Sequence, residues 1–100
     1  HPALPDCPGH ETWKRDFTGS ASVFSIVLAD DWTATRTARF VDALRLFRIG
    51  FSWGGVTSLV MAYPESVRLG ALRERLVRLN VGLEEPADLI EDLRRALEQA

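Results

Sequence analysis

Hydrophobic residues are grouped along this chain in four short runs that are separated by turn-forming residues. The runs are V-F-S-I-V-L (23–28), R-I-G-F (48–51), T-S-L-V-M-A (57–62) and R-L-V-R-L-N-V-G-L (75–83). The first three are rich in β-branched or aromatic residues, and the last alternates apolar with polar positions. Such runs are typical of strands, so we expect a strand in each.

Two longer stretches carry apolar residues at helical spacing. The first predicts a helix from Trp32 to about Leu46, with Asp30 and Asp31 in position to cap it. Its apolar face consists of Phe40, Val41, Leu44 and Phe47.

The second helix is predicted to begin near Pro86, because proline suits the first helical turn. Its apolar stripe consists of Leu89, Ile90, Leu93, Ala96 and Leu97. The order of elements is then β-α-β-β-β-α. This order predicts a two-layer α/β (α+β) domain with a mostly antiparallel sheet of about four strands and helices on one face.

Residues 1–20 are rich in proline and glycine, and they read as turns without regular structure. We interpret them as a segment connecting a missing upstream domain to a small domain over residues 21–100, and we expect the chain to be a fragment of a longer protein. The segment at 64–74 is compatible with either a short helix or an ordered loop.

Composition narrows the classes of function. The net charge of -2 gives no electrostatic reason to bind nucleic acid, and no apolar run approaches the ~20 residues of a membrane span. The single cysteine, Cys7, cannot form an internal disulfide. This suits a cytoplasmic location, which we expect for the protein.

The stretch G-F-S-W-G-G (50–55) contains the G-x-S-x-G pattern of serine hydrolases, with Ser52 as the nucleophile. That pattern requires a helix after the serine and a histidine further along the chain. Here a strand-like run follows, and the histidines, His1 and His10, both precede the serine. A hydrolase is therefore disfavoured.

Two other kinds of site were weighed. Cys7 and the two histidines are too few and too scattered for zinc, so no metal site is expected. Arg78 interrupts the apolar run L-V-R-L. Two interpretations stay open: the stem packs while the charged head reaches solvent, or the guanidinium binds a carboxylate with two parallel hydrogen bonds.

Four stretches, taken together and in order, carry a family resemblance. They are HPALPDCPGHETWKRDFTGS, ASVFSIVL, DALRLFRIGFSWGGVTSLV and LVRLNVGLEEPADLIEDLRRAL. They resemble the C-terminal domain of the pyridoxal-phosphate (PLP) enzymes of cysteine and methionine metabolism, and more narrowly the bacterial cystathionine β-lyases. The tryptophan of S-W-G-G favours the β-lyase branch, since the γ-type enzymes usually carry leucine there.

The resemblance implies a role for each candidate residue. Arg78 would pair with the substrate α-carboxylate, and Ser52, Trp53 and Phe51 would line the site beside it. The implied reaction of the whole enzyme is an α,β-elimination that converts cystathionine to homocysteine, pyruvate and ammonia, with the cofactor ring as electron sink.

The resemblance also implies what this chain does not carry. The cofactor lysine and the phosphate site belong to the large domain upstream, and Lys14, the only lysine here, lies outside their motif. No catalytic or cofactor-binding residue is therefore expected in this chain, which should be inactive alone. The partners implied are the sulfur amino acid substrate, the large PLP-binding domain of the same protein and further copies in a homo-oligomer.

Departures from the family pattern keep alternatives open. Many members have an aromatic residue and a glutamate after S-W-G-G, whereas this chain has Val56 and Thr57. A γ-type or cystine-type sulfur amino acid lyase is the first alternative. A free-standing, non-catalytic interaction domain is the second.

Overall fold

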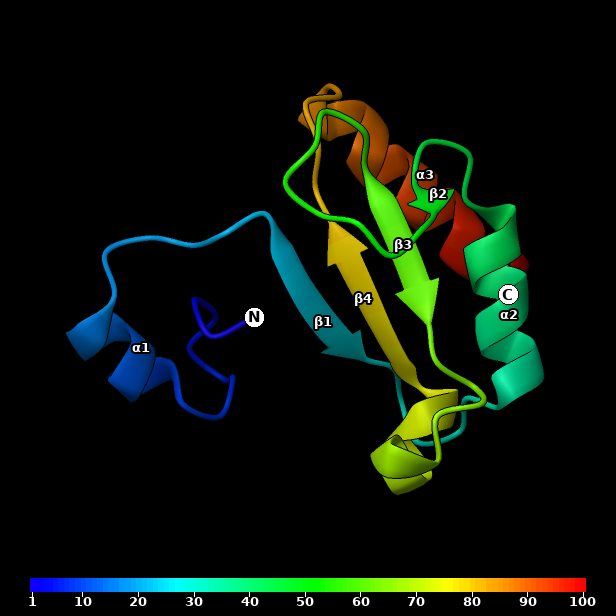
Figure 1. The fold of residues 1–100 in the computed structure, drawn as a ribbon, viewed down its shortest axis with the longest axis horizontal. Helices are drawn as coiled ribbons and strands as arrows, with labels where there is room; N and C mark the ends of the chain where they lie inside the picture. The colour runs from blue at the N-terminus through cyan, green and yellow to red at the C-terminus, as the bar shows by residue number, and fades with distance from the viewer.

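The computed structural model describes residues 1–100, and its centre is a four-stranded sheet in the order β1-β4-β3-β2 (Figure 1). All four strands lie inside the predicted runs. Each strand is shorter than the predicted hydrophobic run, because the residues at the ends of the run belong to loops. The strands are β1 (Val23–Val27), β2 (Arg48–Ile49), β3 (Leu59–Ala62) and β4 (Leu76–Asn80).

The sheet is mixed, with most pairings antiparallel. The central strand β4 pairs antiparallel with both neighbours, so that Arg78 lies opposite Ser25 of β1 and Met61 of β3. The edge strand β2 runs parallel to β3. This follows from the loop at residues 50–58, which leaves the sheet and returns so that β3 starts in register with the start of β2. The predicted fold class is confirmed, with this edge pairing as a refinement.

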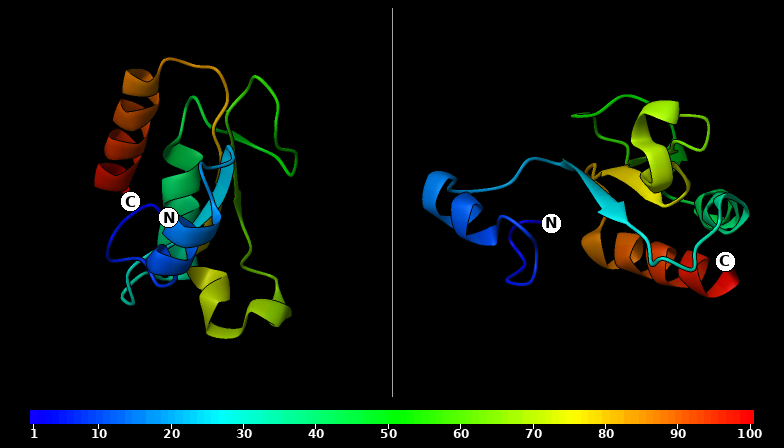
Figure 2. Two further views of the ribbon diagram at one scale, coloured as in Figure 1. Left: turned by 90° about the vertical axis from the view of Figure 1, so that its left-hand side faces the viewer. Right: turned by 90° about the horizontal axis from the view of Figure 1, so that it is seen from below.

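Helices α2 (Ala34–Ala43) and α3 (Pro86–Gln99) lie side by side on one face of the sheet (Figure 2). Because side chains alternate along a strand, Val77 and Leu79 of β4 point to these helices. Leu76, Arg78 and Asn80 therefore lie on the opposite face. The buried apolar core is Phe40, Val41, Leu44, Phe47, Val60, Val77, Leu79, Leu89 and Ala96.

The four apolar residues predicted for the face of the first helix are all buried. The helix itself is shorter than predicted, because α2 ends at Ala43, so Leu44 and Phe47 enter the core from the connection that follows it. A fully buried side chain such as Phe40 stabilises the fold by about 1.5–3 kcal/mol through the hydrophobic effect. The stripe of the last helix is only partly confirmed. Ile90 and Leu97 are 66% and 43% exposed, since α3 contacts α2 and the sheet along a narrower strip.

The N-terminal segment contains a helix that the sequence did not predict, α1 (His10–Asp16). It buries no residue, and it stands apart from the sheet at the end of an extended linker (Figure 1). Gly9 begins it with φ of 84°, a left-handed conformation that glycine adopts at little cost. The interpretation of all of residues 1–20 as turns was therefore wrong for this helix.

Two further local predictions were resolved. Thr33, not the preceding aspartates, caps α2, and its hydroxyl accepts the Arg36 amide at 3.2 Å. Asp31 instead pairs with the Arg36 side chain at 3.0 Å, and Asp30 pairs with Arg75. The ambiguous segment forms a 3₁₀ helix, η1 (Val67–Glu74), which is interrupted at Gly70. None of the helices has the length and apolar character needed to cross a bilayer.

Candidate functional site

Arg78 lies on the face of β4 that points away from α2 and α3, beneath the loop of residues 50–58. Its Nη2 donates a hydrogen bond to the Phe51 carbonyl oxygen at 2.5 Å. The centre of its guanidinium lies 5.9 Å from the ring centroid of Trp53, within cation–π range. The structure thus brings together Arg78, Phe51 and Trp53, three of the four residues that the sequence singled out.

The charge of Arg78 has no counter-ion within the chain. The ion pairs involve other arginines, and only the Phe51 carbonyl bonds to this guanidinium. An arginine stays protonated throughout the physiological pH range, and its planar fork matches a carboxylate. The site therefore offers a fixed positive charge, half-buried against an aromatic ring, to an anionic group from outside the chain.

The loop that covers Arg78 is anchored at its centre by Asn80, a residue that the sequence analysis did not single out. The Asn80 side chain is buried, and its Oδ1 accepts hydrogen bonds from the Gly54 amide at 3.1 Å and the Ser22 hydroxyl at 3.0 Å. Gly54 has φ of 75°, so the turn after Trp53 requires the conformation that glycine tolerates best. The signal in the sequence was the spacing, because Asn80 is two residues beyond Arg78 and shares its face.

A second anchor holds the end of the loop. Ser58 is completely buried, and its amide and hydroxyl donate to the two Glu84 carboxylate oxygens at 2.8 and 2.7 Å. The Gly82 amide donates to the Ser58 hydroxyl oxygen at 2.8 Å. The two hydrogen bonds from Ser58 lower the pKa of Glu84, because they stabilise its charged form. The second anchor is therefore intact at neutral pH.

Between these anchors the middle of the loop is open to solvent. Phe51 is 69% exposed and Trp53 is 63% exposed. Ser52 is exposed as well, and its hydroxyl has no hydrogen-bond partner among the residues of the chain. A rigid frame thus presents an aromatic wall beside Arg78.

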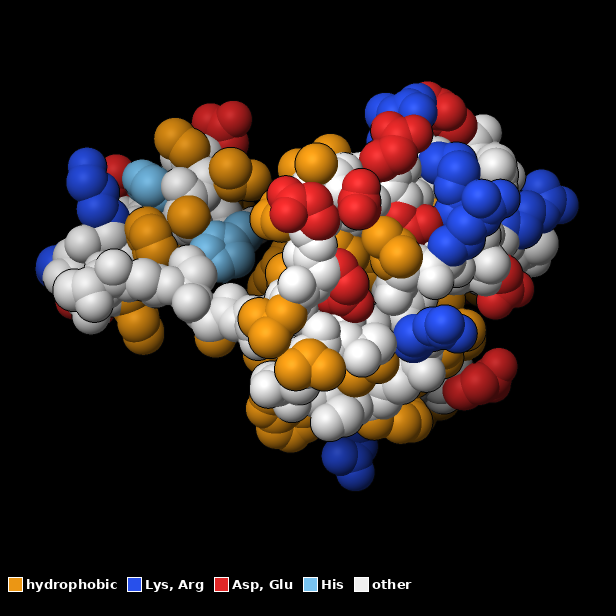
Figure 3. Space-filling view, turned by 90° about the horizontal axis from the view of Figure 1, so that it is seen from above, with side chains coloured by type: hydrophobic (Ala, Val, Ile, Leu, Met, Phe, Trp, Pro, Cys, Tyr) orange, Lys and Arg blue, Asp and Glu red, His pale blue; other side chains and the backbone are white.

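Neither histidine can serve Ser52 as a base. His10 bonds through its ring to the Pro2 carbonyl at 2.7 Å, and His1 packs edge-on against Phe24. Figure 3 shows the histidines gathered in the N-terminal lobe, and the strand-and-turn context lacks the helix that a nucleophile elbow needs. No group of three potential ligands could hold a metal ion, so nothing supports a zinc site.

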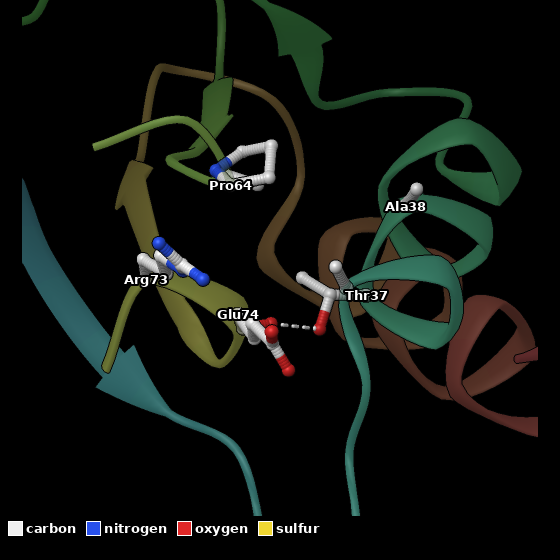
Figure 4. A pocket seen from close by; sticks show the side chains of 7 residues that line it. Thr37, Ala38, Pro64, Arg73 and Glu74 are labelled. Atoms are coloured by element: carbon white, nitrogen blue, oxygen red, sulfur yellow. Dashed lines mark hydrogen bonds between the residues drawn. The ribbon is translucent and has the colours of Figure 1, made fainter. Parts of the chain in front are cut away.

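The residues of this chain do not fit a bound pyridoxal phosphate. Lys14, the only lysine, lies on α1, which stands off the sheet that carries Arg78 (Figure 2). The small cavity of Figure 4, of about 30 Å³, lies between α2 and the 3₁₀ helix, and has room for about two water molecules. There the Thr37 hydroxyl donates to the Glu74 carbonyl, and no residue of the Arg78 site lines the cavity.

Replacing Gly82 with alanine should disrupt the second anchor. A methyl group at this position would meet the Val56 carbonyl oxygen, and it would lie 2.7 Å from the Ser58 amide nitrogen. Backbone atoms cannot move aside, so we expect a loss of about 2 kcal/mol in the free energy of unfolding, measured by urea denaturation. The control is Gly55→Ala, where nothing lies within 4 Å. Equal stability of the two variants would contradict this account of the anchor.

Comparison with known proteins gives a family match over residues 1–98, to the model described as "Cys/Met metabolism PLP-dependent enzyme". The cystathionine beta-lyase of Bordetella avium is 47% identical over 107 residues, which cover 100% of this chain and 26% of that protein. The cystathionine gamma-lyase of Sus scrofa is 38% identical over 110 residues, which cover 100% of this chain and 26% of that protein.

The same similarity holds in three dimensions. A structure of the O-acetylhomoserine sulfhydrylase of Wolinella succinogenes matches with a TM-score of 0.81 and 33% identity, over 97% of this chain and 27% of that one. The chain therefore spans about a quarter of the length of the proteins that it matches.

Proposed function

Because the chain belongs to the PLP-dependent enzymes of Cys/Met metabolism, we propose that it is the C-terminal domain of a carbon–sulfur lyase whose preferred reaction is β-elimination from cystathionine. The observation that carries this proposal is the unpaired Arg78 fork beside Trp53. The substrate is an amino acid with an α-carboxylate, which is the anion that such a fork accepts with two parallel hydrogen bonds.

In this proposal the chain contributes binding and orientation. Arg78 holds the α-carboxylate, and this fixes the position of Cα and its proton relative to groups on the rest of the enzyme. Trp53 forms an apolar wall that limits access of water to the substrate. Ser52 lies next to this wall and contacts the substrate through its hydroxyl or its amide. The Phe51 carbonyl accepts a hydrogen bond from Nη2 of Arg78 and so orients the guanidinium.

The cofactor in this proposal is held by a large domain of the same protein, because this chain has no lysine or phosphate cradle at the site. We also propose a cytoplasmic homo-oligomer, in which the sheet face that carries Arg78 packs against the large domain. The exposed Phe51 and Trp53 side chains on that side are consistent with such a cover.

The choice between β- and γ-elimination rests on two observations. Trp53 stands where the γ-type enzymes resembled in sequence usually carry leucine. The cystathionine beta-lyases of Bordetella avium and Haemophilus influenzae are 47% and 39% identical to the chain, against 38% for the γ-lyase. The γ-lyase and sulfhydrylase similarities make γ-type chemistry the second candidate.

The test uses the protein that contains this chain, purified with its cofactor. We would record its visible absorbance, add cystathionine, and identify the keto acid released. Pyruvate with homocysteine supports β-elimination, whereas α-ketobutyrate with cysteine identifies γ-elimination. If neither keto acid forms from cystathionine, or from cystine as a second substrate, the lyase proposal fails.

A further inference from the structure

The Asn80 side chain makes three hydrogen bonds, two to the loop of residues 50–58 and one to Ser22. Asn80 is 1% exposed, although an asparagine in a strand gains little from burial alone. Its side chain lies two residues beyond Arg78 on the same face of β4, a spacing of about 7 Å. The strand that carries the arginine fork therefore also carries the centre of the anchor for the loop.

The bonds define the orientation of the Asn80 amide. The Gly54 N–H can only donate, so the amide oxygen must face it, at 3.1 Å. The Thr57 carbonyl can only accept, so the amide nitrogen must face it, at 3.5 Å. The two contacts lie on either side of Gly55 and Val56, so that one side chain holds the turn at two points.

Ser22, which directly precedes the neighbouring strand β1, completes the arrangement. Its hydroxyl donates to the same Asn80 oxygen at 3.0 Å, and its carbonyl accepts the Val81 amide at 2.8 Å. The segment that leads into β1 is thereby tied to the loop through one shared oxygen. All buried polar side-chain atoms of the chain are satisfied, so the network leaves no unmet group to explain.

The position of the Gly54 amide decides the direction of Trp53. This amide belongs to the peptide group that follows Trp53, so a hydrogen bond to it fixes that peptide plane and the start of the tryptophan side chain. Arg78 depends on the same loop, since its guanidinium donates to the Phe51 carbonyl. If the Gly54 amide lost its hydrogen bond to Asn80, both the Trp53 side chain and the Phe51 carbonyl that orients Arg78 would become more mobile.

We propose that Asn80 is a positioning residue that sets the geometry of Arg78 and Trp53 and thereby the affinity for the substrate carboxylate. This inference rests on the proposed function, because it concerns the same site. Asn80 acts through the loop and does not touch the substrate. Its loss should therefore weaken binding more than it slows the chemical step.

The experiment compares variants of the whole cofactor-loaded enzyme in steady-state kinetics with cystathionine. Asn80→Ala is expected to raise KM about tenfold while kcat falls less, because a buried hydrogen-bond set is lost at the binding wall. Ser22→Ala should raise KM in the same direction but less, because it removes one of the three bonds from an exposed position. In an Arg78→Ala background, Asn80→Ala should add little, because coupled residues are not additive.

Two controls separate positioning from general damage. Thr37→Val removes another buried hydrogen bond, to Glu74 on the far side of the fold, and should lower stability without changing KM. Hydrogen exchange of the whole enzyme should be faster in a peptide covering residues 51–58 in Asn80→Ala, but not in Thr37→Val. That second readout does not depend on activity.

The outcomes are distinct. An active wild type with unchanged KM in Asn80→Ala overturns the inference and leaves the proposed function standing. An equal rise in KM in Thr37→Val also overturns it, since the effect would then be merely structural. If the wild type has no lyase activity, the proposed function fails. In that case the hydrogen-exchange measurement still tests Asn80: an unchanged exchange rate at residues 51–58 in Asn80→Ala would overturn its role as an anchor of the loop.

Discussion

Replacing Arg78 with alanine should lower kcat/KM of the whole enzyme for cystathionine by about 10³-fold, mainly through a higher KM. Under the proposed function, the variant loses the charge-assisted, bidentate partner of the substrate carboxylate, and truncation of such a pair costs about 2–5 kcal/mol. The measurement is initial-rate release of keto acid over a range of cystathionine concentrations.

Lysine at the same position tests the importance of geometry. Arg78→Lys keeps the positive charge but loses the planar fork, and it also loses the fixed bond to the Phe51 carbonyl. We therefore expect an activity between those of the wild type and Arg78→Ala, with about a tenfold to hundredfold loss.

The matched control for Arg78 is Arg36→Ala. Arg36 lies on α2, stacks over Trp32 at 4.2 Å and pairs with Asp31, away from the proposed site. Its loss should leave KM unchanged. A KM for Arg78→Ala within about twofold of the wild type would exclude a carboxylate-binding role for this residue, whatever the fate of kcat.

The largest effect on stability is expected at Asp92, in the middle of α3. Its side chain is buried, and its carboxylate accepts the amides of Arg45, Leu46 and Phe47 and pairs with Arg95 at 2.7 Å. These amides lie between the end of α2 and β2, so one carboxylate closes that connection. Asp92→Ala leaves the three amides and an arginine without their partner, and we expect a loss of about 3–5 kcal/mol in the free energy of unfolding.

The same carboxylate gives the fold a defined acid sensitivity. Burial acts to raise the pKa of Asp92, but the hydrogen bonds from the three amides and Arg95 outweigh it, so its pKa lies below the ordinary value. A group with a lowered pKa contributes stability above its unfolded pKa of about 4, and that contribution is lost as the pH falls through the folded value. The contribution of Asp92 is therefore complete at neutral pH and declines below about pH 4.

Urea denaturation at pH 7 and pH 3 checks both statements. The difference in stability between the wild type and Asp92→Asn should be large at pH 7 and should shrink at pH 3, because pH 3 lies below the unfolded pKa of about 4. Glu91→Gln, an exposed neighbour on the same helix, is the control and should change little. A difference that is independent of pH would mean that charge at Asp92 does not stabilise the fold.

The sequence predicted those strands and helices whose buried residues recur at regular spacing, every second residue in a strand and every third or fourth in a helix. Val77 and Leu79 alternate with Arg78, and Phe40 and Leu44 recur at helical spacing, so strand, helix and core face follow from local sequence. Helix α1 buries no residue and follows a proline-rich run, so it leaves no periodic signal. Its residues had nothing in their pattern to distinguish them from turns.

The candidate site could be predicted in its solvent-facing residues and not in its support. The resemblance pointed to Arg78, Phe51 and Trp53, which the fold brings together. The roles of these three residues and of Ser52 in binding substrate stay predictions. Asp92 shows why support is harder to find. It reads as one more charge on a polar helix, and its amide partners lie 45 to 47 positions earlier in the chain. Only the tertiary fold brings such pairs together.

In the loop over Arg78, the positions that are anchored to the rest of the fold differ from the positions that face solvent. This separation has a consequence for redesign. The anchors are made by one short stretch, residues 80–84, which grips the loop at Gly54 and Ser58. The exposed side chains in the loop make no hydrogen bond to that stretch, so their substitution should leave the anchors intact. They are Phe51, Trp53 and Val56. A library randomised at the exposed positions, with the anchors kept, would vary the surface beside Arg78 on an unchanged frame.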